Sequence, residues 1–271
     1  MSLTSLINQP DVRAKLKQEF PKPKFTSKQQ LLAPALTKNY GLVGTAFDYL
    51  LRFYVKQMNP QAIERGWVAE NSVRLLKQSG SHRLYEQGYL ISTQAREEYA
   101  RFLQTQQLTD ELIRDSLLLA KLDVFLRVGK IDENLQDVDE KDVEDLRRLI
   151  SLVDANLFKS SGVVALNPTF GLASNIVGGA DADLLIDDLL IDIKTKKELT
   201  LERDEFNQLI GYYTLYKIDG IDCAPPQHLI RRLGIYFSRY AYLHVIPIGE
   251  VIDESRFPHF VEWFKERADK K

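Results

Sequence analysis

The hydrophobic positions along the chain change their spacing near residue 160. Between residues 41 and 157, apolar residues recur every three or four positions, which is the spacing of helices with one buried face. The first such group contains Phe47, Leu50, Leu51, Tyr54 and Val55. Beyond residue 160, apolar residues form short runs separated by Gly, Pro and Asp, which is typical of strands joined by turns. The pattern predicts a mostly helical region over residues 41–160 and a strand-containing core over residues 161–271.

The strand-containing region also includes helical patterns. Strands are expected at residues 163–166, 184–186, 189–191 and 233–237. Helices are expected at residues 204–217, before the stop signal Asp219-Gly220, and at residues 254–267. Strands and helices that follow a helical region indicate an α/β (α+β) fold.

The first 40 residues are polar and rich in Lys, Gln and Pro. Pro21-Lys22-Pro23-Lys24 excludes a helix interior or a central strand at that point, because proline lacks the backbone N–H that both structures use. We therefore predict an N-terminal arm over residues 1–40.

Composition narrows the class of protein. With 44% hydrophobic and 27% charged residues, the chain has the composition of an ordinary globular protein. The 36 Lys and Arg against 38 Asp and Glu exclude a strongly basic nucleic-acid coat protein, although not a local basic groove. The single cysteine, Cys223, excludes an internal disulfide and a thiolate metal site. Because no signal-peptide or membrane-spanning pattern is found, we expect a cytoplasmic protein without a membrane partner.

Charge is divided unevenly between the two regions. The net charge of −2 separates into +2 for residues 1–159 and −4 for residues 160–271. The densest acidic run lies between Asp132 and Asp145. It lacks the glycine at the sixth position and the closing glutamate that a calcium-binding loop needs. We expect a solvated helix start there.

Two apolar runs flank Asp187-Asp188, which predicts a β-hairpin because Asp tolerates the positive φ of a two-residue turn. The hairpin then has one wholly apolar face, made of Leu184, Ile186, Leu189, Ile191 and Ile193. The other face carries Leu185 and Leu190 near the turn. Beyond them, Asp183 lies opposite Asp192, and Asp181 lies opposite Lys194. A slip of one residue would break this pairing, so the choice between Asp181 and Asp183 stays open.

Carboxylates that face each other across a strand pair repel, because their Cβ atoms lie about 4.5–5.5 Å apart. A cation should offset this repulsion, and Lys194 or a hard divalent ion such as Mg²⁺ or Mn²⁺ would suit. The alternative is a half-exposed hairpin that ends in solvated charges. Leu185 and Leu190 indicate that this face is covered, which favours a functional site.

Three motifs resemble the PD-(D/E)XK nuclease superfamily, and they occur in the order of its RecB-like branch. Asp183 followed by Asp192-Ile193-Lys194 resembles the superfamily core, with Ala182 in place of the usual Pro. Gln208-Leu209-Ile210-Gly211-Tyr212 matches the Q-x-x-x-Y motif of the branch. The segment Gly44-Thr45-Ala46-Phe47-Asp48-Tyr49-Leu50-Leu51 is similar to its first motif, G-T-x-x-H-x-x-L, with Asp48 in place of His.

The resemblance implies a restriction-endonuclease-like core, in which helices flank a mixed central sheet. It would cover the first-motif helix and residues 161–271, so that the helical stretch from about residue 60 to 158 would be a large insertion. The implied activity is Mg²⁺-dependent (or Mn²⁺-dependent) hydrolysis of phosphodiester bonds in DNA, by exo- or endonucleolytic cleavage, in repair, recombination or defence.

The resemblance also implies roles for particular residues. Metal would be held by Asp183, Asp192 and Ile193, with Asp48 or Asp181 completing the ligands or binding a second ion. Lys194 would act on the attacking water or the phosphate, and Gln208 and Tyr212 would position the lysine and the nucleic acid. The nucleic acid would be gripped by Lys196, Lys197, Arg231, Arg232 and Arg239.

Simpler interpretations exist for the single motifs. Gln208 and Tyr212, four residues apart, share a helix face and would also fit an ordinary surface pair. Asp48 would form a surface ion pair with Arg52. The alternative for the whole chain is a catalytically silent nucleic-acid-binding or interaction protein on the same fold. A different metal-dependent phosphoesterase, or an interaction module based on the helical region, would also fit.

Overall fold

A computed structural model describes residues 2–129 and 134–270. Helices α3 (Tyr40–Met58), α4 (Val68–Gln78), α5 (His82–Thr105), α6 (Asp110–Val128) and α7 (Glu140–Ser151) pack together as a helical unit. The strands are β1 (Ile63–Glu64), β2 (Val164–Leu166), β3 (Leu184–Ile186), β4 (Leu189–Lys194), β5 (Arg232–Phe237) and β6 (Tyr242–Pro247). The remaining helices are α1 (Leu3–Ile7), α2 (Pro10–Glu19), α8 (Gly171–Ile176), α9 (Arg203–Asp219), α10 (Ile248–Val251) and α11 (Phe257–Asp269).

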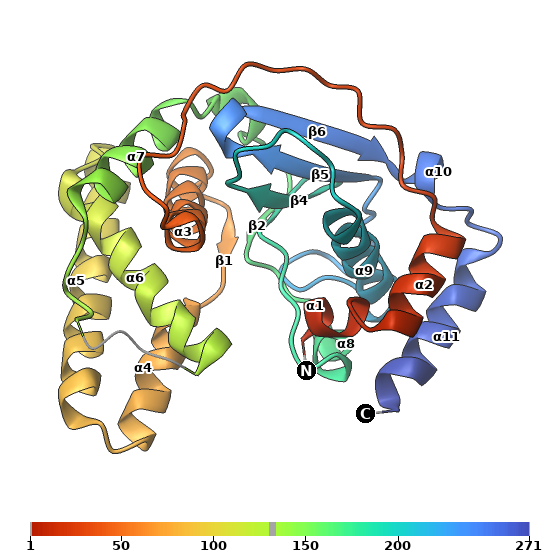
Figure 1. Ribbon diagram of the computed structural model, residues 1–271, viewed down its shortest axis with the longest axis horizontal. Coiled ribbons are helices and arrows are strands. Elements are labelled where there is room, and N and C mark those ends of the chain that lie inside the picture. The colour runs from red at the N-terminus through yellow and green to blue at the C-terminus, as the bar shows by residue number, and fades with distance from the viewer. Residues whose placement is uncertain (1, 130–133, 271) are drawn as a thin grey trace.

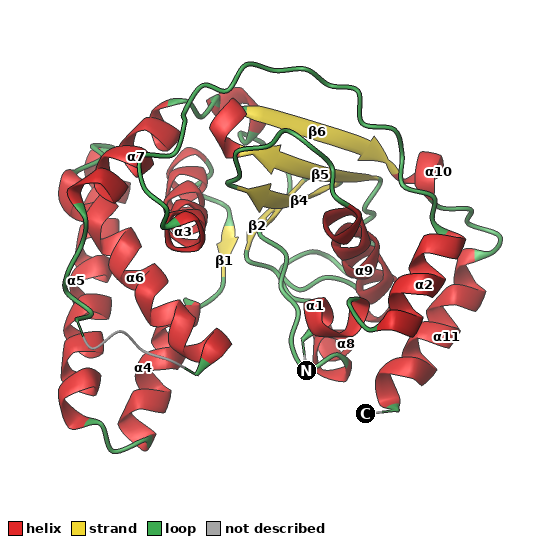
Figure 2. Cartoon of the chain, in the orientation of Figure 1, coloured by secondary structure: helices red, strands yellow, loops and turns green. Residues whose placement is uncertain are grey.

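Within the described residues the strands form one six-stranded sheet in the order β1-β2-β3-β4-β5-β6. The β1–β2 and β4–β5 pairs are parallel, and the other pairs are antiparallel. The helical unit lies on one side of this mixed sheet, and α1, α2, α8, α9 and α11 lie on the other (Figures 1 and 2). The α/β class and the mixed sheet flanked by helices are thus confirmed.

The β3–β4 hairpin has the predicted register. Leu184 pairs with Ile191, Leu185 with Leu190, and Ile186 with Leu189. Asp187 adopts the positive φ, 51°, that the turn requires. The face that begins with Leu184 packs into the cluster of the helical unit, whereas Leu185 and Leu190 pack beneath α9. Both faces of the hairpin are therefore covered.

Residues 2–20 differ from the predicted arm. They form α1 and α2, whose apolar residues pack into the cluster around α9 and α11. A side chain at Gly211 would bring its Cβ within 3.0 Å of Leu3, so glycine at this position lets α1 approach α9. Only residues 21–39 run as an extended arm, which passes over β6 toward the helical unit (Figure 1).

Two strands were not predicted. β1 contains only two residues, Ile63 and Glu64, and pairs with β2, so it is defined by its partner rather than by its own pattern. β6 lies at the edge of the sheet, and most of its residues are half-exposed. Neither strand has the continuous apolar run by which a buried strand is identified.

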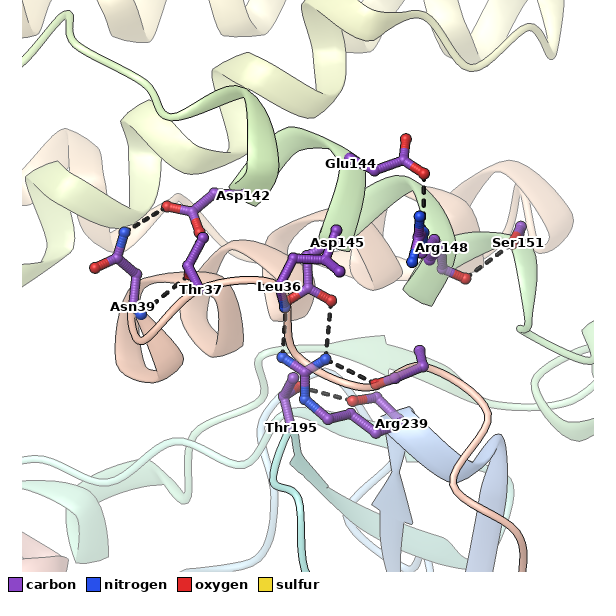
Figure 3. A network of polar contacts seen from close by, with 12 residues as sticks. Leu36, Thr37, Asn39, Asp142, Glu144, Asp145, Arg148, Ser151, Thr195 and Arg239 are labelled. Atoms are coloured by element: carbon purple, nitrogen blue, oxygen red, sulfur yellow. Dashed lines mark hydrogen bonds and ion pairs between the residues drawn. The ribbon is translucent and has the colours of Figure 1, made fainter.

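A buried ion pair joins the helical unit to the end of β5 (Figure 3). Arg239 donates to both carboxylate oxygens of Asp145, at 2.8 and 3.0 Å, and each side chain is only 1% exposed. The same guanidinium donates to the backbone oxygen of Ala33 at 2.9 Å, and the amide of Leu36 donates to Asp145 Oδ2 at 3.4 Å. The arm is thereby held between the helical unit and the end of β5.

This ion pair corrects two expectations. The acidic run does start a helix as expected, since α7 begins at Glu140 with the exposed Asp139 as its N-cap, but Asp142 and Asp145, expected to be solvated, are buried. Asp142 accepts hydrogen bonds from Thr37 and Asn39 of the arm (Figure 3). Arg239 was expected to contact nucleic acid, but its guanidinium is enclosed. The first part of the acidic run, residues 130–133, lies outside the described residues.

We predict that Arg239→Met lowers the free energy of unfolding by about 3–5 kcal/mol, because it leaves the Asp145 carboxylate buried without its partner. The matched control is Arg147→Met, which removes exposed ion pairs with Asp110 and Glu144 and should cost about 1 kcal/mol or less. Urea unfolding measures both. The double variant Arg239→Met/Asp145→Leu should recover much of the lost free energy of unfolding. If Arg239→Met cost no more than the control Arg147→Met, the Arg239–Asp145 ion pair would not stabilise the fold as described.

Candidate active site

The predicted carboxylates and the lysine of the site come from three places around the end of β4. Asp192 and Lys194 alternate with apolar residues along β4 and share the face that α9 covers. Asp183 directly precedes β3. Asp48 lies on α3, where a Cβ at Gly44 would contact Thr195 at 3.7 Å, so this helix passes close to the end of β4.

Asp183 is attached to β4 by its side chain. Its Oδ2 accepts a hydrogen bond of 2.6 Å from the backbone N–H of Ile193. Ile193, expected among the metal ligands, therefore contributes its amide to Asp183, while its side chain packs toward the helical unit. Asp183 thus lies beside Asp192, as the register predicts, although β3 itself begins one residue later.

Asp181 does not lie opposite Lys194 as predicted. It forms an isolated bridge with Thr169, and Asn167 and Ala182 make the backbone hydrogen bonds that connect residues 181–183 to the segment after β2. The chain before β3 therefore follows β2 instead of β4. Burial raises the pKa of the Tyr212 phenol, and the charges of Asp192, Asp183 and Asp181 raise it further, so Asp181 still lies near the site.

A chain of polar contacts runs from β4 to α9. Lys194 Nζ lies 2.6 Å from Asp192 Oδ2 and donates to Gln208 Oε1 at 3.1 Å. Gln208 Nε2 in turn donates to the hydroxyl of Tyr212 at 2.7 Å. The ring of Tyr212 stacks on Phe170, with 5.6 Å between centroids. The two motif residues of α9 therefore share one face, as their spacing predicts, and this face meets the lysine.

Asp48 is paired with Arg52, as the simpler interpretation proposed, but the pair is not on the surface. Arg52 donates to Asp48 Oδ2 at 2.6 Å, and its side chain is 6% exposed. Its guanidinium also lies over the ring of Tyr49, 4.5 Å from the centroid. Asp48 Oδ1 is buried and has no hydrogen-bond partner among the described residues. One carboxylate oxygen is thus left for another ligand.

Burial and mutual repulsion set the protonation of the cluster. Burial raises the pKa of Asp183 well above its ordinary value, and the charges of Asp48 and Asp192 raise it further. Burial also raises the pKa of Asp192, against the opposing effect of Lys194. For Lys194, burial alone would lower the pKa, but Asp192 and Asp183 outweigh it and raise the pKa. The lysine is therefore a cation at neutral pH, and the carboxyl groups repel one another.

The donor atoms fit a hard divalent cation in type. Asp48, Asp183 and Asp192 supply carboxylate oxygens, which Mg²⁺ and Mn²⁺ prefer. Asp192 Oδ2, like Asp48 Oδ1, is buried without a hydrogen bond, although Lys194 holds it by charge. Across residues 2–129 and 134–270, however, no three His, Cys, Asp or Glu side chains converge closely enough to hold a metal ion. Binding would therefore require these side chains to move, above all Lys194 away from Asp192.

Glu205 belongs to the site and was missed. Its charge raises the pKa values of Asp192 and Lys194, and its Oε1 lies 2.6 Å from Lys196 Nζ. Its other oxygen accepts the amide of Glu202 as part of a capping box at the start of α9. Glu205 lies three residues before Gln208, so it shares that helix face. This spacing was the signal from which it could have been found.

The residues expected to grip nucleic acid are dispersed. Lys196 lies beside the site, where it pairs with Glu205 and covers the ring of Phe237, and Lys197 is exposed next to it. Arg231 and Arg232 lie at the opposite end of β4, because β5 begins where β4 begins, and Arg232 pairs there with Asp188. Because Arg239 is buried, Lys196 and Lys197 are the two of these five residues that lie beside the site and could reach a nucleic acid.

No family model, no curated protein and no solved structure matches the chain. Within the described part of the chain, no helix is both long enough and apolar enough to cross a membrane.

We predict that Asp183→Asn raises the Tm by a few degrees at pH 7 in EDTA, since about 1 kcal/mol shifts the Tm of a chain of this size by about 2–4 °C. The pKa of Asp183 is higher in the folded than in the unfolded chain, so the folded state loses stability as the pH rises from the unfolded value of about 4. Asparagine does not ionise, so the Asp183→Asn variant does not lose this stability as the pH rises.

The difference in Tm should disappear below about pH 4, where the unfolded aspartate is also protonated. Thermal melts between pH 3.5 and 8 measure it. Asp187→Asn, in the exposed hairpin turn, is the control and should change the Tm little at any pH. A variant Asp183→Asn that is less stable than the parent throughout this range would show that the carboxylate is not repelled.

Proposed function

We propose that this protein is a divalent-metal-dependent nuclease that hydrolyses phosphodiester bonds in DNA, on a PD-(D/E)XK-like core. The observation that carries this proposal is the buried cluster at the end of β4. Asp183 is attached there by the Ile193 amide, beside Asp192 and Lys194. The proposed roles in repair, recombination or defence follow from the resemblance alone.

The order of the motifs and their placement support one another. The first motif contributes Asp48, the hairpin contributes Asp183, Asp192 and Lys194, and α9 contributes Gln208. These segments are far apart in the sequence, and the fold brings all of them to one end of β4. A mixed sheet flanked by helices is what a restriction-endonuclease-like core requires.

Mg²⁺ or Mn²⁺, when bound, would supply a Lewis acid for the phosphoryl oxygen and an activated water. Asp183 and Asp192 would hold the ion, with the unpartnered oxygen of Asp48 nearby. The remaining chemistry falls to this chain's own groups. Lys194 stays protonated and can donate to a phosphoryl oxygen as negative charge grows there. Gln208 orients the ammonium through its Oε1, and Tyr212 fixes the amide of Gln208.

We predict Mg²⁺- or Mn²⁺-dependent cleavage of DNA that EDTA abolishes. Asp192→Asn and Lys194→Met should each lower the cleavage rate by about 100-fold or more, because the first removes a metal ligand and the second removes the donor to the phosphate. Lys265→Met, on the exposed face of α11, is the matched control and should cleave normally. Gel assays on single- and double-stranded DNA measure the rates, and circular dichroism verifies folding.

The ion pair between Lys194 and Asp192 favours a second candidate, a catalytically silent protein in which the lysine permanently replaces the metal. Mn²⁺ binding, measured by electron paramagnetic resonance, separates the two. In the nuclease, Lys194→Met frees Asp192 and binds Mn²⁺ at least as tightly as the parent while cleavage is lost. If neither protein binds Mn²⁺ and DNA stays intact, the silent protein is the correct assignment.

A further inference from the structure

The outer surface of the α4–α5 hairpin carries an aromatic pair, of which Tyr89 is exposed and Tyr85 is half-buried against the helical unit. Tyr85 and Tyr89 lie one turn apart on α5, with 6.1 Å between ring centroids and 38° between ring planes. Tyr89 is 59% exposed, and the neighbouring Leu90 is 56% exposed. Such large apolar groups on a surface usually mark a binding site when they occur together.

Basic side chains alternate with these rings. Lys77 Nζ lies 5.7 Å from the centroid of Tyr85. Arg74, which is exposed, lines a cavity of about 430 Å³ between α4 and α5 together with Tyr89 and Arg96. Arg96 lies over the ring of Trp67, 3.5 Å from its centroid, and is paired with Glu70. We call Arg74, Lys77, Tyr85, Tyr89 and Arg96 the α4–α5 strip.

The strip is linear because the two helices form a hairpin. From Tyr85 to Arg96 the helix rises by about 16 Å, at about 1.5 Å per residue. Lys77 and Arg74 follow the same direction on α4, beside Tyr85 and Tyr89 respectively. Rings and cations thus alternate over a length that accommodates a few nucleotides of an extended strand.

Charge favours a polyanion as the partner. The two helices and their turn, residues 68–105, contain five Lys or Arg and four Glu. Glu70 is paired with Arg96 and Glu98 with Arg101, each at 2.8 Å. Arg74 and Lys77 are exposed beside the rings, which suits phosphate groups better than an acidic or neutral apolar partner.

We propose that the α4–α5 strip binds single-stranded nucleic acid, with a base stacked on Tyr89, whose ring is supported by Tyr85, and phosphates paired with Arg74 and Lys77. Stacking on exposed rings requires bases that are not already paired inside a duplex. This binding goes beyond the proposed cleavage, since it uses no metal and lies on the helical unit. In Figure 1 the hairpin lies away from the sheet, so the strip would hold a strand apart from the cleavage site.

The test is fluorescence anisotropy of a labelled oligothymidylate of 12 nucleotides, bound to the full chain in EDTA. Loss of one stacked base costs about 1–3 kcal/mol, so Tyr89→Ala should weaken binding by about 5- to 150-fold. Arg74→Ala should also weaken binding and lower the slope of log K against log salt by about one. A duplex of the same length should bind more weakly than the single strand.

The controls are Tyr40→Ala, another exposed tyrosine, and Arg256→Ala, an exposed arginine at the start of α11. Both should bind like the parent. Equal binding by the parent and Tyr89→Ala would overturn the proposal, whether Arg74 matters or not, because attraction of any polyanion would then suffice. Absence of binding by the parent would also overturn it, and would leave a protein as the partner of the strip.

Because EDTA prevents cleavage, this result is independent of the proposed nuclease activity. A chain that binds through the strip but cleaves no DNA in Mg²⁺ or Mn²⁺ supports the strip and contradicts the nuclease. If the chain cleaves DNA but Tyr89→Ala binds the oligonucleotide as well as the parent, the nuclease is supported and the strip is contradicted.

Discussion

The structure depends on how charge is accommodated at the covered end of β4. Asp192 is 1% exposed, and Asp183 and Asp48 lie near enough for their charges to act on one another. Burying carboxylates costs free energy unless a cation or donor compensates. Lys194, Arg52 and the Ile193 amide supply part of that compensation. The proposed function accounts for the remainder, because a divalent ion would offset the repulsion that these groups leave.

The other elements bring these charges together and hold them. The hairpin has apolar residues on both faces, so the helical unit and α9 can cover it from opposite sides. The Arg239–Asp145 ion pair fastens α7 and the arm to the end of β5, next to the strand that carries Lys194. The Ser238 hydroxyl donates a hydrogen bond of 2.8 Å to the Thr195 hydroxyl. In the sequence, Ser238 is next to Arg239, and Thr195 is next to Lys194. The helical unit that supplies Asp48 is therefore fixed against the sheet close to the site.

Local patterns predicted much of the fold. The hairpin register and the shared face of Gln208 and Tyr212 depend only on periods of two and of about four residues, which the sequence displays directly. What could not be predicted depends on distant partners. Asp181 departs from β4 because its segment pairs with residues after β2. The sequence around Asp145 predicts a solvated carboxylate, because nothing local indicates that Arg239, 94 residues away, lies beside it. The helices of the first 20 residues likewise depend on the apolar surface that α9 and α11 provide.

The most direct test of the central claim is to locate a divalent ion. Crystals grown with Mn²⁺ should show an anomalous scattering peak between the carboxylates of Asp183 and Asp192, with Lys194 turned away from Asp192. The peak should be absent from Asp192→Asn crystals grown in the same way. An unchanged Lys194–Asp192 ion pair, with no peak at the end of β4 in saturating Mn²⁺, would contradict the account.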